Sequence, residues 1–97
     1  MNMEEKDIHA ALQVSKEKLV HFHCVENDRG APGSGHTPWE TFFKGLNAIG
    51  YAKCLTLEMF ILANETVSPD LGIWRDIEHS PSQAAKDGLA FLKEHTA

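Results

Sequence analysis

The first regular pattern in the chain is a set of apolar residues at helical spacing among charged ones, between Glu4 and Lys18. Ile8, Ala11, Leu12 and Val14 fall on one stripe of such a helix, while the other positions are mostly polar. A stripe of this kind predicts an amphipathic helix that covers one side of a larger structure.

Two short stretches have the composition of β-strands. Leu19–Cys24 is rich in β-branched and aromatic residues, and the "NDRGAPGSG" that follows favours neither helix nor strand. Lys53–Glu58 has a similar pattern and predicts a second strand. The glycine-rich stretch between them lacks the lysine of a phosphate-binding loop, which favours a plain turn.

Two further helices are predicted from their start and stop signals. Thr37 and Pro38 resemble an N-cap and a first helical residue, and Gly50 supplies a stop after an apolar series formed by Phe42, Phe43, Leu46 and Ile49. Trp39, at the start of this helix, is expected to pack against the core.

The remaining part of the chain predicts a short helix over Leu71–Asp76, in which Trp74 is expected to pack, and then a final long helix. Ser80 is the expected N-cap of the final helix and Pro81 its first residue. Its apolar stripe is expected to consist of Ala84, Ala85, Leu89 and Leu92.

This alternation of helices and strands is typical of an α/β fold in which right-handed helical crossovers join parallel strands. Two parallel strands alone make a poor sheet, because parallel sheets are normally covered on both faces and contain more strands. We therefore expect residues 1–97 to be a single segment of a larger α/β structure.

Composition narrows the function classes. The chain has 97 residues, and 14 acidic against 9 basic side chains give a formal charge of −5, which argues against nucleic acid as a partner. The longest apolar runs are about half the length that a membrane span needs. Cys24 and Cys54 have no metal-binding or disulfide-framework spacing, so we expect free thiols and a cytoplasmic protein.

The candidate chemistry lies at the ends of the two predicted strands. His21 and His23 are two positions apart, so their side chains share one face of a strand. His23 and Glu58 end neighbouring strands, and in α/β sheets and barrels function gathers at those ends. An imidazole and a carboxylate suit a divalent metal, although such a site needs about four to six donors.

Plainer roles are open for the same residues. A strand histidine is often only hydrogen bonded, and a glutamate at a strand end often faces solvent. Arg29 would then pair with a nearby acid such as Glu26 or Asp28. For Glu26 and His36, the sequence indicates no role beyond holding the loop that follows the first predicted strand.

A longer motif adds to these patterns. His-x-His-x-x-Glu-Asn-x-Arg-Gly-x-Pro-Gly-x-Gly-x-x-x-Trp runs from His21 to Trp39, and "AIGY", "LEMF" and "IWRDI" follow it. This series resembles the C-terminal third of the sugar phosphate isomerase/epimerase superfamily, which has the xylose isomerase-like barrel. Within it, the sequence is most similar to the D-tagatose and D-psicose 3-epimerases.

The resemblance implies a fold and an activity. The fold would be a partial (β/α)8 TIM barrel, made of the last two strand-helix units with a preceding helix. The activity would be that of a ketose isomerase or epimerase, which transfers a proton at the carbon next to the carbonyl of a small-molecule sugar. A divalent metal is implied as cofactor, with Mn²⁺ first and Co²⁺ or Mg²⁺ as alternatives.

The resemblance also assigns residues. His23 would be a metal ligand, and Glu58 both a metal ligand and one of two catalytic glutamates. Arg29 would contact the substrate, and Phe60 would form an apolar wall beside the sugar. Asp28 departs from the asparagine that the 3-epimerases commonly have there, which leaves the sugar open.

The family's upstream ligands and its second catalytic glutamate have no counterpart in this chain, so the chain alone is not expected to complete the reaction. The alternative is a non-catalytic part of a barrel that associates with itself or with a partner, and a homo-oligomer is expected in either case. The nuclease branch of the superfamily is disfavoured because it needs more ligands and a basic face.

Overall fold

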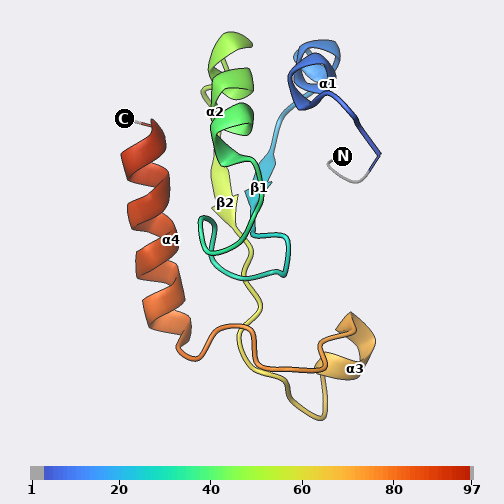
Figure 1. The fold of residues 1–97 in the computed structure, drawn as a ribbon, viewed down its shortest axis with the longest axis vertical. Coiled ribbons are helices and arrows are strands. Elements are labelled where there is room, and N and C mark those ends of the chain that lie inside the picture. Colours follow the sequence, from blue (N-terminus) through green and yellow to red (C-terminus); the bar gives the residue numbers. More distant parts are fainter. Residues whose placement is uncertain (1–3, 97) are drawn as a thin grey trace. The chain divides into compact units, whose positions relative to one another are not determined.

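The computed structural model describes residues 4–96 of the chain. The elements follow in the order α1 (Ile8–Ser15), β1 (Phe22–Cys24), α2 (Trp39–Ala48), β2 (Leu55–Leu57), α3 (Ser68–Leu71) and α4 (Pro81–Thr96) (Figure 1). β1 and β2 are parallel neighbours in a two-stranded sheet. The predicted alternation of helices and strands is confirmed, and both strands are shorter than their sequence patterns.

The described residues form two compact units. Residues 4–22 and 38–56 make the first unit, and residues 23–37 and 57–96 make the second. The first unit contains α1 and α2, whereas the second contains α3, α4 and the loop after β1. Within residues 4–96, no helix is both long and apolar enough to cross a membrane.

In the first unit, α1 packs on α2 through a close approach. Asp7 caps α1, because its side chain accepts the N–H of Ala10 at 3.0 Å. Leu12 is fully buried, and a Cβ built on Gly45 of α2 would lie 2.5 Å from its Cδ1 atom. Val14 is 90% exposed, so its predicted place on the buried stripe is wrong.

The helix α2 begins one residue later than predicted. Pro38 occupies the N-cap position and makes no side-chain cap hydrogen bond, so the assignment of Thr37 as N-cap is wrong. The predicted stop is confirmed, since Gly50 has a φ of 68° and donates its N–H to a carbonyl of the last turn. Phe42 is buried, with its ring edge-on to Phe22 at 5.7 Å between centroids.

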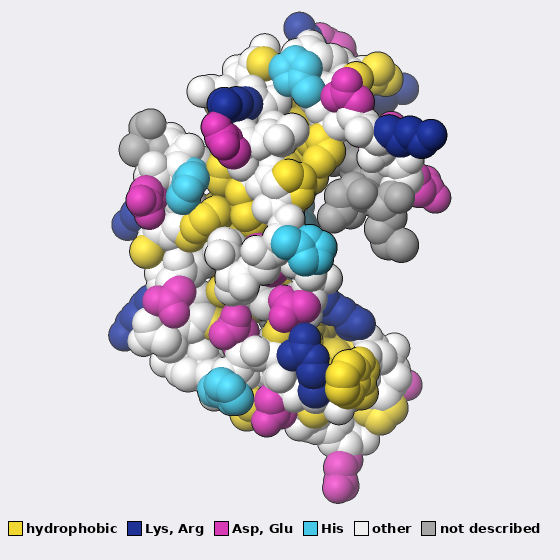
Figure 2. All heavy atoms as spheres, viewed as in Figure 1, with side chains coloured by type: hydrophobic (Ala, Val, Ile, Leu, Met, Phe, Trp, Pro, Cys, Tyr) yellow, Lys and Arg dark blue, Asp and Glu magenta, His cyan; other side chains and the backbone are white. Residues whose placement is uncertain are grey.

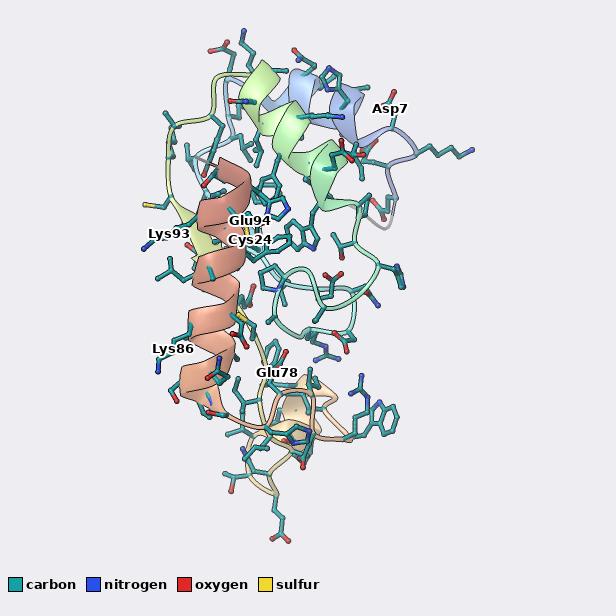
Figure 3. All side chains as sticks on the ribbon, turned by 60° about the vertical axis from the view of Figure 1, so that its left-hand side comes forward. Asp7, Cys24, Glu78, Lys86, Lys93 and Glu94 are labelled. Atoms are coloured by element: carbon teal, nitrogen blue, oxygen red, sulfur yellow. The ribbon has the colours of Figure 1, made fainter. Side chains whose placement is uncertain are left out.

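In the second unit, α4 starts as predicted, because the Ser80 hydroxyl accepts the N–H of Gln83 at 3.3 Å. Its buried face differs from the predicted stripe. Gly88 is buried and its missing Cβ would lie 2.9 Å from Leu57, whereas Leu89 is 48% exposed. The buried row is therefore Ala84, Gly88 and Leu92, spaced by one helical turn, while Lys86 and Lys93 are exposed (Figure 3).

The predicted helix over Leu71–Asp76 is wrong, because Leu71 ends α3 (Ser68–Leu71) and the residues after it are not helical. α3 contains a proline in its first turn and ends at Gly72, whose φ is 66°. Proline favours a helix start, and glycine in the left-handed conformation favours a helix end, which together place the helix earlier. Trp74 comes after this end and is 84% exposed, so its predicted packing is also wrong.

Gly33→Ala is expected to destabilise the chain by about 2–4 kcal/mol, because strain and a collision act together. Gly33 has a φ of 92°, and a Cβ there would lie 2.5 Å from the Phe91 ring of α4. Gly50→Ala is the matched control, since its φ is 68° but nothing lies within 4 Å of the added atom. Urea unfolding should show a loss of about 1 kcal/mol for the control. Equal losses would contradict close packing of the loop on α4.

Candidate functional site

The site begins with a contact between side chains at the ends of the two strands. His23 lies on the exposed face of β1, while Phe22 and Cys24 on either side of it are buried, as the alternation predicts. Glu58 follows β2 directly, and its N–H donates to the carbonyl of Cys24 at 3.4 Å. This pairing brings His23 Nδ1 and a Glu58 carboxylate oxygen into direct contact, with both side chains about half exposed.

The chemistry of this pair suits a divalent metal. An imidazole nitrogen and a carboxylate oxygen are both ligands for Mn²⁺, Co²⁺ and Zn²⁺, and the contact brings these two donor atoms together. Among residues 4–96, no three His, Cys, Asp or Glu side chains are grouped so that they could hold a metal. This stretch therefore offers two donors where such ions take about four to six.

The two strand histidines have different partners. The ring of His21 lies 3.1 Å from the Thr56 hydroxyl, whereas His23 contacts Glu58. Both interactions join residues of β1 and β2 or their immediate neighbours. Of these two histidines, His23 is therefore the one that contacts a carboxylate.

Arg29 and Phe60, the two predicted substrate contacts, lie together. The guanidinium carbon of Arg29 is 5.5 Å from the centre of the Phe60 ring. The Phe60 N–H donates to the Arg29 carbonyl at 2.9 Å, and Arg29 Nη1 donates to the carbonyl of Leu71 at 2.6 Å. Both residues belong to the same compact unit as His23 and Glu58.

The alternative in which Arg29 pairs with a neighbouring acid is wrong. Asp28 instead contacts Arg75, with 3.2 Å between Oδ2 and Nη2, and Arg75 also lies over the Trp74 ring. On the face drawn in Figure 2, basic side chains lie directly beside hydrophobic ones. Arg29, Asp28, Trp74 and Arg75 line a cavity of about 190 Å³.

The thiol beside the site belongs to the core. Cys24 is fully buried, and its burial raises the pKa of the thiol to about 11, so it stays protonated near neutral pH. Figure 3 labels its position. Cys54 is an exposed free thiol, so neither cysteine forms a disulfide, as predicted.

Glu26, to which the sequence assigned no more than a role in holding the loop, is central to the loop after β1. Glu26 is only 3% exposed, and its carboxylate accepts hydrogen bonds from three backbone amides. The signal that could have found it is an acid placed before a glycine-rich loop, where many amides lack partners from regular structure.

Comparison with known proteins identifies the fold. Residues 1–95 match the family described as xylose isomerase-like TIM barrel, and the chain belongs to this family. Its fold is therefore part of a (β/α)8 barrel, as the sequence predicted.

Individual relatives define the group more closely. The chain is 34% identical over 94 residues to a probable ketose 3-epimerase of Synechocystis sp., covering 97% of this chain and 33% of the relative. It is 32% identical over 98 residues to D-psicose 3-epimerase of Agrobacterium fabrum, and the match covers 96% of this chain and 34% of that relative. A solved structure of L-ribulose 3-epimerase superposes with a TM-score of 0.88 at 33% identity, and the match covers 99% of this chain and 33% of that one. The predicted likeness to 3-epimerases is confirmed, and the chain spans about a third of the length of these relatives.

Proposed function

We propose that this chain is the C-terminal segment of a divalent-metal-dependent ketose epimerase. The observation that carries the proposal is the contact between His23 Nδ1 and the Glu58 carboxylate at the ends of neighbouring parallel strands. The named relatives, which are ketose and D-psicose 3-epimerases, support a small sugar as the substrate. In this proposal residues 1–97 act as a single segment of one barrel.

His23 and Glu58 would hold the metal, which we propose to be Mn²⁺, with Co²⁺ or Mg²⁺ as alternatives. When bound, the metal polarises the carbonyl and the neighbouring hydroxyl of the ketose. The remaining donors would come from the part of the relatives' length that this chain does not span. Both side chains are about half exposed, which leaves room for further ligands.

Glu58 would also exchange the proton of the reaction. Its carboxylate would take the proton from the carbon next to the carbonyl; the electron pair of the broken C–H bond then forms a double bond to the carbonyl carbon, and the carbonyl π pair moves onto the oxygen. Inversion needs a second carboxylate that returns a proton on the opposite face of the carbon. We place that second group outside this chain.

Arg29 and Phe60 would position the sugar. A guanidinium donates several hydrogen bonds in a fixed plane, which suits hydroxyl and carbonyl oxygens of a ketose. The Phe60 ring, 5.5 Å from the Arg29 guanidinium carbon, would form an apolar wall beside it. The two side chains would thus contact different surfaces of one substrate.

The second candidate is a non-catalytic part of a barrel that associates with itself or with a partner. It is favoured by a sheet of two strands and by exposed apolar side chains such as Val20, at 66%, and Trp74, at 84%. Association is compatible with either candidate, and we propose a homo-oligomer for both. Metal binding separates them.

His23→Ala is expected to weaken Mn²⁺ binding at least about tenfold, because it removes one of the two donors. The measurement is calorimetric titration of the complete barrel that contains this chain, with and without the substitution, and molar mass is followed by light scattering. His36→Ala is the matched control, since His36 is an exposed histidine of the same unit. The proposed site is contradicted if the unsubstituted barrel binds no Mn²⁺, or if the control loses as much affinity as His23→Ala.

A further inference from the structure

Glu26 is a buried carboxylate that lies outside the metal and proton chemistry proposed above. It is 3% exposed and is the first residue of the loop formed by residues 26–37, which we call the 26–37 loop. One oxygen accepts the N–H of Asn27 at 3.0 Å and that of Thr37 at 2.7 Å, and the other accepts the N–H of Gly33 at 2.9 Å. One side chain thus accepts three backbone amides of the loop.

These amides come from the start, the middle and the end of the loop. The carboxylate therefore fixes the path of the whole segment instead of one turn. Gly35 has no side chain at the place where a Cβ would collide with Glu26 Cγ and Asn27 Oδ1. The loop can close around the carboxylate only because this position is a glycine.

The same closure shapes the backbone at Arg29. The Glu26 N–H donates to the Gly30 carbonyl at 3.0 Å, and the Arg29 N–H donates to the Glu26 carbonyl at 2.9 Å. Arg29 is the one non-glycine residue with positive φ among residues 4–96, at 71°. A side chain in this conformation costs about 1–2 kcal/mol, so the surrounding contacts must impose it.

The backbone conformation of Arg29 in turn sets where its side chain goes. Its carbonyl accepts the Phe60 N–H at 2.9 Å, and its guanidinium lies over the Phe60 ring and donates to the Leu71 carbonyl. A different φ at Arg29 would turn the side chain away from this wall. The path from Glu26 to Arg29 is thus a short series of hydrogen bonds within one unit.

We propose that Glu26 is a positioning residue: it fixes the 26–37 loop and so holds the Arg29 guanidinium against Phe60, ready to bind the sugar. The inference rests on the proposed function for the part that concerns sugar binding. Glu26 does not itself touch the substrate in this scheme, because it is buried and both its oxygens already accept amide hydrogens.

Glu26→Gln tests the proposal with little change in shape. A carboxamide has one acceptor oxygen, so in either orientation its NH₂ group faces at least one backbone N–H of the loop. Glu78→Gln is the matched control, since Glu78 also accepts an amide of this loop, that of Ala31 at 2.8 Å, whereas the two backbone hydrogen bonds of the turn at Arg29 are made by Glu26. Figure 3 labels Glu78, between α3 and α4.

The first readout is NMR of the 97-residue chain without sugar. Glu26→Gln is expected to shift the amide signals of Gly33 and Thr37, the Arg29 Nε–H signal and the Phe60 ring signals. Glu78→Gln should leave the Arg29 and Phe60 signals in place. Glu26→Asp, which keeps the charge but shortens the reach, serves if Glu26→Gln does not fold, and should shift the same signals. Unchanged Arg29 and Phe60 signals in the Glu26 variants overturn the positioning role, whether or not sugar binds.

The second readout is the affinity for D-psicose with Mn²⁺ present, measured on the complete barrel that contains this chain, in a double-mutant cycle with Arg29→Ala. Glu26→Gln should weaken the affinity about tenfold when Arg29 is present, as expected for a misplaced hydrogen bond from a charged group, and by less than about twofold in the Arg29→Ala background. Equal weakening in both backgrounds overturns action through Arg29. An unsubstituted barrel that binds no D-psicose contradicts the proposed function alone, because the NMR result still decides how Arg29 is held.

Discussion

Glu58→Gln is expected to lower the rate of ketose epimerisation by about 10²–10⁴-fold, because a carboxamide cannot accept a proton from the sugar carbon. The substitution nearly preserves the shape of the side chain. Glu58 is about half exposed, so little change in folding stability should accompany the loss. The rate is measured as interconversion of D-psicose and its C3 epimer, in the complete barrel that contains this chain.

Two roles are proposed for Glu58, and the same variant separates them. If the carboxylate only holds the metal, saturating Mn²⁺ should restore the rate of Glu58→Gln. If it also transfers the proton, the rate stays low when the metal site is full. Glu94→Gln on α4 is the control, because Glu94 is an exposed glutamate remote in sequence from the strand ends. A rate for Glu58→Gln close to that of the control would exclude Glu58 from the reaction.

Elements with strong local signals were predictable from the sequence. Ser80 with Pro81 starts α4, and Gly50 ends α2, because a capping hydroxyl, a proline and a left-handed glycine act on adjacent backbone groups. The contact between His23 and Glu58 was also predictable, since it needs only two parallel strands in the correct register.

Features that depend on distant residues were not predictable in the same way. Gly88 of α4 is buried because Leu57 fills the space beside it, and an apolar pattern gives no weight to glycine. One interpretation of the sequence paired Arg29 with an acid nearby in sequence, but its partners are Phe60 and the Leu71 carbonyl. Those contacts depend on a positive φ at Arg29 that no local propensity favours.

Glu26 illustrates the limit for the site. Its position in the sequence suggests an ordinary loop acid, yet it is 3% exposed and accepts the amides of Gly33 and Thr37. Only the closed path of the loop reveals that these amides converge. A motif can therefore identify the residues that would touch the sugar, while the residues that orient them emerge only from the fold.

Leu12→Ala is expected to lower the free energy of unfolding by about 2–5 kcal/mol, the cost of deleting a well-packed core side chain. Leu12 is fully buried against Gly45 of α2. The helix α1 has 8 residues, fewer than the roughly 12–15 at which isolated helices become even marginally stable, so it depends on this packing. Since small domains are stable by only about 5–15 kcal/mol, the variant should be partly unfolded under mild denaturing conditions.

Val14→Ala is the matched control on the same helix, because Val14 is 90% exposed and its change should stay within about 0.5 kcal/mol. Urea unfolding followed by far-ultraviolet circular dichroism measures both variants. A large loss for Leu12→Ala alone would establish that α1 is held through one buried side chain against α2. Similar losses for the two would instead mean that α1 is held through its exposed face, as expected if another part of a barrel or a second copy covers Val14.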